Sequence, residues 1–265
     1  MIGNKPSVYN AQSVYNGGGG GDGSFTVDLG GGVQQTFTLP PYLTPVEYVD
    51  NSNYTTGKLN IIGSRQIPAA SDASQYFVKL VVQPNKNKWG NYGVDAFTLT
   101  QGLKINGTSS DTRFSFTNSV GRITANIGGA STSISNLELD QKLFIEYDAA
   151  TINLVVKSIN GVIGSATGSG SYPTVNYGQF CVFNHFIDSP NYIFKGRFFY
   201  SYVKKGDEVV ALFVPARRKD GSNLQPYIVE CVSGSIALNC STDSTTNGLE
   251  FGPDIDLSDI GNYFQ

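Results

Sequence analysis

Residues 196–218 read GRFFYSYVKKGDEVVALFVPARR, and this stretch decides the fold. Runs rich in aromatic and β-branched residues lie on either side of Gly206. Such residues favour strands, and two strands joined by a short turn that contains glycine are typical of a β-hairpin. We therefore predict a hairpin in which residues 196–206 run out and residues 208–218 run back.

The first strand of this hairpin has two faces of different character. Alternate residues of a strand share a face, so Phe198, Tyr200 and Tyr202 are predicted to lie together. The opposite face carries Arg197, Phe199, Ser201 and Val203. We expect the aromatic face to be buried between two packed sheets.

Further strands are predicted along most of the chain, separated by Gly, Asn, Asp or Pro. They are residues 75–84, 95–105, 112–119, 121–129, 142–149, 151–161, 177–186 and 226–238. Tight hairpin turns are predicted at Ala149-Ala150 and at Asn160-Gly161. No long window shows the apolar period of a helix. The pattern favours an all-β, antiparallel fold, either a two-sheet sandwich or a barrel.

Residues 1–23 are predicted to be an extended attachment arm. The word Ser-Val-Tyr-Asn occurs at residues 7–10 and again at 13–16, and Gly17–Gly21 follow as a flexible tether. Val and Tyr suit a strand, so each word could add a short strand to the sheet edge of a partner. The expected docking side chains are Val8, Tyr9, Val14 and Tyr15.

Residues 24–45 are predicted to be a small β-hairpin followed by a proline-rich linker. Phe25, Val27 and Leu29 alternate before three glycines, and Val33, Gln35, Phe37 and Leu39 alternate after them. An isolated hairpin is marginal in water, so this one should pack on the main domain or on copies of itself. Pro40, Pro41 and Pro45 indicate a stiff linker. The main domain is then residues 46–254, and residues 255–265 are a C-terminal tail.

The composition argues against two classes of partner. The chain has 265 residues, a net charge of −3 and only 15% charged residues. Nucleic acids and anionic membranes attract stripes of Lys and Arg, whereas Arg217-Arg218-Lys219 is the longest basic cluster. No apolar run approaches the ~18 residues of a membrane span, and residues 1–10 lack the apolar core of a secretory signal. We expect a neutral surface, no nucleic-acid or membrane partner, and synthesis in the cytosol.

The cysteines do not suggest a disulfide framework. There are three, Cys181, Cys231 and Cys240, and an odd number is a poor basis for paired thiols. Cys181 lies in an apolar run and is interpreted as a buried small hydrophobic residue. Cys231 and Cys240 either pair across a hairpin or stay reduced, and the sequence favours the reduced state.

Two stretches resemble the concanavalin A-like, laminin-G-like jelly-roll domains of phage and prophage virion proteins. Glu47-Tyr48-Val49 and Tyr54-Thr55-Thr56-Gly57 match the opening strand of that family. Residues 196–200 match the start of a late hairpin, and Val209 and residues 212–215 match its return strand. Residues 225–228 depart from the closing segment of the family. The resemblance covers about residues 46–254 and implies a two-sheet antiparallel jelly roll.

The resemblance also implies a setting. A polar arm ahead of a glycine tract is similar to the N-termini of head-fibre and decoration proteins, in which the arm docks to the particle. This implies a non-enzymatic virion protein, assembled in the host cytoplasm, whose arm binds the major capsid protein or another virion protein. We expect a homo-oligomer, a trimer in preference to a dimer. The alternatives are a carbohydrate-binding receptor module of a tail or fibre and, disfavoured, a glycan hydrolase.

Hydrolases of this superfamily carry clustered carboxylates on one strand, and this chain lacks the full pattern. Retaining hydrolysis needs two carboxyl groups about 5 to 5.5 Å apart. The candidates are Glu138-Leu139-Asp140 and Glu146-Tyr147-Asp148, and neither has the third carboxylate. His185, the single histidine, would lie ~13 Å from Cys181 on a strand, too far for proton transfer. We predict that the protein is not an enzyme.

Two binding sites remain as expectations. Asp254, Asp256 and Asp259 are candidate calcium ligands. The favoured alternative is that these aspartates belong to a tail that packs through Ile255, Leu257 and Tyr263. Trp89, Asn91 and Tyr92 are the candidate glycan site, because an indole face stacks on sugar C–H groups and amides bind hydroxyls. The alternative is that Trp89 fills the edge of the sandwich. No other cofactor is expected.

Overall fold

The computed structural model describes residues 23–28, 33–53, 75–88, 93–100, 104–105, 108–109, 112–117, 120–127, 130–170, 181–182, 194–218, 226–232, 235–239 and 248–260. Within these ranges the regular structure is almost all antiparallel strand, with a short 3₁₀ turn at Lys86–Lys88 and one short α-helix, α1, at Leu257–Ile260. The described residues include no helix that has the length and hydropathy to cross a bilayer. The predicted all-β class is confirmed.

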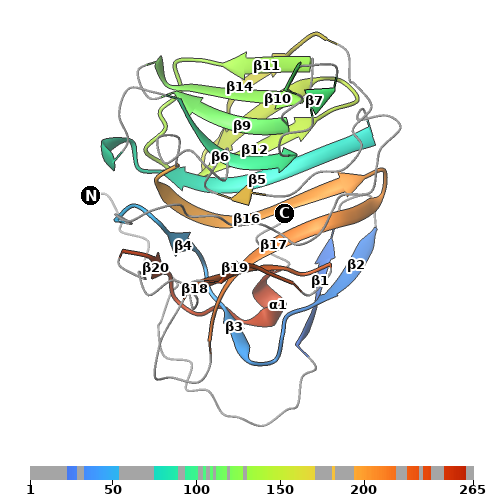
Figure 1. Cartoon of the computed structure of the whole chain (residues 1–265), viewed down its shortest axis with the longest axis vertical. Helices are drawn as coiled ribbons and strands as arrows, with labels where there is room; N and C mark the ends of the chain where they lie inside the picture. Colours follow the sequence, from blue (N-terminus) through green and yellow to red (C-terminus); the bar gives the residue numbers. More distant parts are fainter. Residues whose placement is uncertain are drawn as a thin grey trace, which may run out of the picture.

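A large sheet forms the centre of the molecule (Figure 1). Its main strands follow the order β14-β13-β12-β5-β16-β17-β18-β19. Their bounds are β14 Gly161–Thr167, β13 Asn153–Ser158, β12 Leu143–Asp148, β5 Tyr76–Pro84, β16 Gly196–Lys205, β17 Glu208–Arg218, β18 Pro226–Glu230 and β19 Ser235–Asn239. The short strands β3 (Leu43–Pro45), β4 (Val49–Asp50) and β20 (Glu250–Phe251) join it through β17 and β16.

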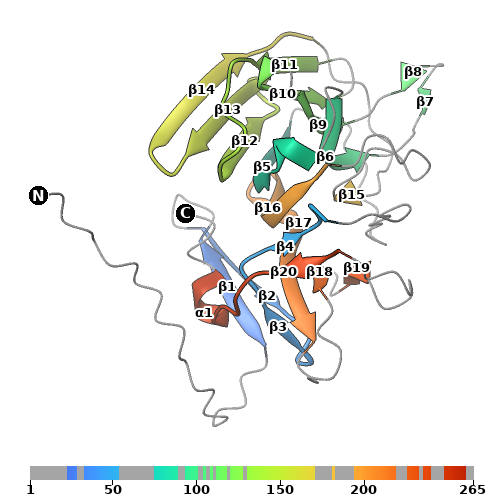
Figure 2. The same ribbon diagram turned by 90° about the vertical axis from the view of Figure 1, so that its left-hand side faces the viewer.

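A second sheet packs on one face of the large sheet (Figures 1 and 2). Its strands are β11 Ala130–Ile134, β10 Arg122–Ile127, β9 Thr112–Thr117, β6 Gly93–Thr100 and β15 Cys181–Val182, in that order. Strands β7 (Lys104–Ile105) and β8 (Thr108–Ser109) form a separate pair. Phe116 and Ile123 of the second sheet are buried with Leu80, Ile145 and Phe198 of the large sheet. The predicted two-sheet antiparallel sandwich is therefore confirmed.

A third layer lies on part of the opposite face of the large sheet (Figure 2). It consists of β1 (Ser24–Asp28) and β2 (Gln34–Thr38), which pair antiparallel with Phe25 opposite Phe37. This confirms the predicted hairpin. Its inward side chains are buried in one cluster with residues of β17, β18 and α1; the cluster includes Phe25, Val27, Phe37, Leu39, Leu212, Val214, Tyr227 and Ile260.

The central strands are covered on both faces as a result. Every residue from Val209 to Ala216 in β17 is buried, and so is every residue of β18. Strands buried on both faces have continuous apolar runs instead of alternation. The run VVALFVPA of β17 is apolar throughout. A strand exposed on one face would alternate with polar residues, so the three-layer arrangement explains this sequence.

The predicted alternation of side chains in β16 is wrong at one point. The register between β16 and β5 shifts between Phe198 and Tyr200, which makes Phe199 an extra residue in the ladder. Phe198 lies in the core between the two sheets, whereas Phe199, Tyr200 and Tyr202 lie in the cluster beneath the hairpin. A β-bulge moves the following side chains to the other face. The sequence pattern hides this bulge because both faces of the strand are apolar.

Residues 40–45 differ from the predicted linker. Leu43–Pro45 form β3, which pairs with β17 so that Pro45 lies opposite Ala216, and Leu43 is buried. Prolines are tolerated in short peripheral strands. The hairpin, this segment and β17 share one hydrophobic cluster. The apolar face of the hairpin is thus covered by its own chain, and the predicted homo-oligomer would have to form through other surfaces.

Three smaller differences concern where strands begin, end or are divided, and one strand that was not predicted. Residues 226–238, predicted as one strand, form β18 and β19, which pair antiparallel on either side of a turn at Cys231. Strand β11, with the polar sequence ASTSI, was not predicted. The turn before β14 places Ser158 opposite Gly161, one residue earlier than predicted. Each difference involves small or polar residues, which carry a weak strand signal.

The start of β16 depends on a buried asparagine and a glycine. The Asn51 side chain donates to the Phe194 carbonyl at 2.6 Å and accepts from the Gly196 N–H at 2.8 Å. Gly196 has a φ of +149°, and a Cβ there would lie 2.2 Å from the Gln83 carbonyl oxygen. Only glycine fits this close approach, which explains the residue that opens the deciding stretch.

We predict that Phe37→Ala will destabilise the whole sandwich. Phe37 is 4% exposed and belongs to the cluster shared with β17, and truncating a buried Phe costs about 3 to 5 kcal/mol. Equilibrium denaturation followed by circular dichroism should show one transition with a lower midpoint. Thr36→Ala, at an exposed neighbouring position, should change stability by less than about 0.5 kcal/mol. A separate early transition for the hairpin would contradict the shared core.

Candidate functional site: the pocket beside β2

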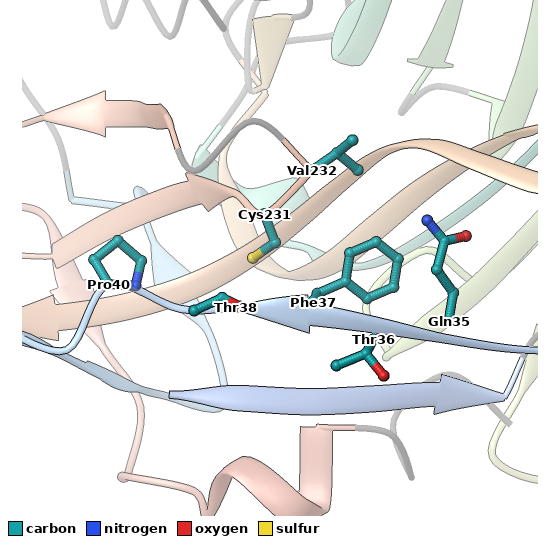
Figure 3. A pocket seen from close by; sticks show the side chains of 7 residues that line it. All are labelled: Gln35, Thr36, Phe37, Thr38, Pro40, Cys231 and Val232. Carbon is teal, nitrogen blue, oxygen red and sulfur yellow. The ribbon is translucent and has the colours of Figure 1, made fainter. Parts of the chain in front are cut away.

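A pocket of about 410 Å³ lies between β2 and the turn that follows β18 (Figure 3). We call it the β2 pocket. Its volume falls within the range of roughly 300 to 1,000 Å³ that is usual for ligand sites. The residues that line it are Gln35, Thr36, Phe37, Thr38, Pro40, Cys231 and Val232.

Strand β2 turns main-chain hydrogen-bonding groups toward this pocket. Among the described strands it pairs with β1 alone. The Leu39 N–H donates to the Gly23 carbonyl at 2.9 Å, and this pair continues the register in which Thr38 lies opposite Ser24. Hydrogen-bonded and non-hydrogen-bonded pairs alternate along an antiparallel ladder. Thr38, and likewise Thr36, are therefore in non-hydrogen-bonded pairs, and their N–H and C=O groups point away from β1.

The side chains of β2 fix the hairpin on the large sheet. The Phe37 ring is buried, with its centroid 5.9 Å from that of Phe25. The Gln35 side-chain oxygen accepts the Val209 N–H at 3.1 Å. On the exposed face, the Thr36 hydroxyl lies 3.3 Å from the Thr26 hydroxyl. The inward side chains thus form the floor of the pocket, and its edge is main chain.

A buried carboxylate holds the opposite wall. Glu230 is fully buried, and its Oε1 accepts the Leu212 N–H at 3.2 Å and the Val232 N–H at 3.0 Å. The Cys231 N–H donates to the Leu212 carbonyl at 2.7 Å. These bonds position Cys231 and Val232 against β17, and Figure 3 shows both side chains on the far side of the pocket from Thr36.

Among the described residues that line the pocket, Cys231 is the only titratable one, and it is a free thiol in this structure. Burial, with the Glu230 charge as a second cause, raises the pKa of the Cys231 thiol well above its usual value. A protonated thiol is a poor nucleophile. Of the two states left open for Cys231, the structure has the reduced one, and Cys240 lies outside the described residues.

We predict that Glu230→Ala will destabilise the protein and loosen the pocket wall. The change removes the acceptor of two buried main-chain N–H groups, each of which costs about 1 to 3 kcal/mol when left unsatisfied. Chemical denaturation should show the loss. Glu230→Gln retains a side-chain carbonyl and should lose less than half as much. Equal losses in the two variants would show that the carboxylate does not act through these bonds.

The candidate catalytic carboxylates of β12 have structural partners. Glu146 lies 3.7 Å from the Lys79 ammonium and 2.7 Å from that of Lys157. Burial lowers the pKa of Lys79, and the Glu146 charge opposes this. The Asp148 carboxylate accepts the Ala150 N–H and the Thr151 hydroxyl, each at 2.9 Å. Glu146 thus forms ion pairs with two lysines, and Asp148 stabilises the turn that leads to β13.

The other predicted acidic residues lie apart from the β2 pocket. Glu138 and Asp140 are exposed, in the connection between β11 and β12 and not on a strand. The Asp254 carboxylate accepts hydrogen bonds from Arg217, at 2.6 Å from Nε. Asp256 and Asp259 are exposed. Within the described residues no group of three His, Cys, Asp or Glu is placed to hold a metal ion, and calcium binding at Asp254 and Asp256 stays a prediction.

The tail around these aspartates packs on the sandwich in part. Ile255 and Leu257 lie against the cluster beneath the hairpin, and Ile260 is buried in it. The remaining predicted site residues lie outside the described residues, so their roles stay predictions. They are Val8, Tyr9, Val14 and Tyr15 of the arm, Trp89, Asn91 and Tyr92 of the glycan loop, and His185.

Sequence reasoning missed the β2 pocket, although two signals were present. Gln35 occupies an inward position of an otherwise apolar alternation, and Glu230 is the last residue of the otherwise uncharged, buried strand β18. A polar residue at a position that is otherwise apolar indicates a buried side chain that forms hydrogen bonds. Neither signal says that residues near 36 and 231 meet across a cavity.

The comparisons with known proteins return distant structures and no sequence relative. No protein-family model and no curated protein matches the chain. A heptameric SAP-like pentraxin from Limulus polyphemus has 13% identity over 62% of this chain and 77% of its own, with a TM-score of 0.41.

Two further structures are similar at the same level. The CBM40 of a Ruminococcus gnavus IT-sialidase, bound to α2,3-sialyllactose, has 9% identity over 58% of this chain and 94% of its own, with a TM-score of 0.37. Domains LG4-5 of the mouse laminin α1 chain have 7% identity over 79% of this chain and 71% of their own, with a TM-score of 0.34. Likeness at this level assigns no ligand to the chain.

Proposed function

We propose that the protein is a non-enzymatic structural subunit of a phage virion, a head-fibre or decoration protein. In this proposal the arm, residues 1–23, docks to the major capsid protein or another virion protein, and the sandwich faces outward. The single observation that carries the proposal is that β1, the strand into which the arm leads, is built into the sandwich. Phe25 and Val27 of β1 are buried in the cluster shared with β17.

This construction suits an attachment point. The β1–β2 ladder into which the arm leads has five residue pairs, Ser24 to Asp28 with Thr38 to Gln34. The buried side chains of both strands resist sliding across the large sheet. A head joined in this way would keep its position relative to the anchor.

The chemistry of the described residues agrees with a structural role. Of the two candidate carboxylate pairs, Glu146 is engaged with Lys79 and Lys157 and Asp148 with its own turn, whereas Glu138 and Asp140 are exposed and do not lie on a strand. Val8, Tyr9, Val14 and Tyr15 remain the proposed docking side chains. Assembly as a trimer, or alternatively a dimer, would multiply weak contacts of each arm.

The arm can be tested by its effect on attachment. A full-length variant with Val8, Tyr9, Val14 and Tyr15 all changed to Ala should lose co-sedimentation with particles assembled from the structural proteins of the same genome. Its far-UV circular dichroism should match that of the unchanged chain, because the sandwich begins after residue 23. The matched control changes Gln34, an exposed residue of β2, to Ala and should co-sediment normally. Attachment by the four-residue variant would overturn the proposal.

Carbohydrate binding is the second candidate function. Trp89, the only tryptophan, lies with Asn91 and Tyr92 in the segment between β5 of the large sheet and β6 of the second sheet. Segments that connect strands commonly carry binding residues. Low overall charge, 15% of residues, suits a neutral, hydroxyl-rich ligand.

A glycan array separates this candidate from a purely structural role. The full chain should bind at least one glycan class, and Trp89→Ala should reduce that signal at least about fivefold, since loss of an aromatic stacking contact costs roughly 1 to 3 kcal/mol. Phe251→Ala, at a partly buried residue of β20, controls for general loss of aromatic area. Unchanged binding by the Trp89 variant would place any glycan site elsewhere.

A further inference from the structure

We infer that the β2 pocket is a strand-addition site and that its occupant is Ser13–Asn16, from the arm of the same chain. The inference does not depend on the proposed attachment role but narrows it, because Val14 and Tyr15 would bind β2 and leave Val8 and Tyr9 for the partner. It rests on three observations: the direction of the β2 main chain, the lining of the pocket, and the point at which the arm enters the fold.

The main chain of β2 offers the hydrogen bonds that an added strand needs. Gly23 and Leu39 form a hydrogen-bonded pair, and hydrogen-bonded and non-hydrogen-bonded pairs alternate from there along the β1–β2 ladder. The N–H and C=O groups of Thr36 and Thr38 therefore point to the edge of β2 that lies away from β1. Both residues line the pocket. Exposed strand edges promote unwanted pairing, and proteins commonly cover them. A strand laid in the pocket would pair with both threonines.

The lining of the pocket fits the chemistry of Ser-Val-Tyr-Asn. The pocket presents Phe37, Val232 and the protonated Cys231 as apolar surface, and Gln35 as a neutral polar group. The word is likewise uncharged. Successive side chains of a strand point to opposite faces, so either register of the word buries one of Val14 and Tyr15 against the apolar surface. The other side chain would lie on the outer face with the Thr36 hydroxyl.

The arm enters the fold beside the pocket. Gly23 is held next to Leu39, one residue beyond the Thr38 end of the edge. Residues 17–23 include six glycines and can span up to ~23 Å, whereas the five residues of β2 extend over ~17 Å. The tether therefore lets Ser13–Asn16 lie along β2 in either direction. A short flexible tether gives a millimolar effective concentration, which favours the arm of the same chain over that of a second copy.

This occupant also explains why the word is doubled. With Ser13–Asn16 on β2, the identical word Ser7–Asn10 remains outside the pocket. The chain would then cover its own sheet edge with one word and keep the other for a partner. The nearer word is assigned to β2 because effective concentration falls as the tether lengthens.

Hydrogen exchange by NMR on the full chain tests the inference. The Thr36 and Thr38 amides should exchange at least roughly tenfold faster in a Val14→Ala/Tyr15→Ala variant than in the unchanged chain, because an amide exchanges slowly only while it is hydrogen-bonded. The matched variant Val8→Ala/Tyr9→Ala should change these rates much less. Equal effects of the two variants, or no effect of either, would overturn the assignment to Ser13–Asn16.

A second pair of variants tests the edge itself. Thr36→Pro removes the N–H that points into the pocket and leaves the β1–β2 bonds in place, and proline is tolerated on strand edges. In this variant the amides of residues 13–16 should exchange as in an unfolded peptide, whereas in Thr36→Ala they should stay protected. The protection should not depend on protein concentration or on the oligomeric state that light scattering reports. Protection that appears only with dimer formation would overturn the same-chain occupant in favour of arm exchange between copies.

Discussion

The burial of β16 and β17 on both faces is the constraint on which the rest of the structure depends. Phe198 and Phe213 face the core between the sheets, and Leu212 and Val214 face the cluster beneath the hairpin. Apolar surface left in water costs about 25 cal/mol per Å², so the second face needs a cover. The β1–β2 hairpin supplies it, and a two-stranded hairpin is marginal until it has such a surface to pack on. Each element therefore stabilises the other.

The β2 pocket lies beside the point at which the pairing of β17 with β18 stops. Strand β18 pairs with β17 only from Phe213 onward, so Val209 and Leu212 lie beyond its reach. Their N–H groups are taken by side-chain oxygens, Gln35 from the hairpin and Glu230 from β18. These two polar residues hold the hairpin and the turn at Cys231 a short distance apart. The space between them is the pocket, and the edge of β2 bounds it.

The same features give the N-terminal arm a structural context. In the sequence the arm is followed by β1. The side chains of β1 and β2 that face the large sheet are buried against it. The proposed attachment role and the proposed pairing of the arm with β2 are compatible, because one repeat of Ser-Val-Tyr-Asn would bind the edge while the other would reach a partner. The neutral lining of the pocket and the low charge of the chain point to recognition by main-chain hydrogen bonds and apolar contacts.

The sequence by itself determined the class of fold, most strands, and the hairpins at 24–39 and 196–218, because a two-residue period and a glycine turn are local properties of the chain. Only the tertiary structure decided which face each side chain occupies. The bulge at Phe199 sits between two apolar faces and leaves no periodic signal. The packing of the hairpin on its own sheet and the meeting of Thr36 with Val232 across a pocket depend on contacts between segments far apart in the chain. Such contacts are set by register and by long-range burial, which local patterns do not encode.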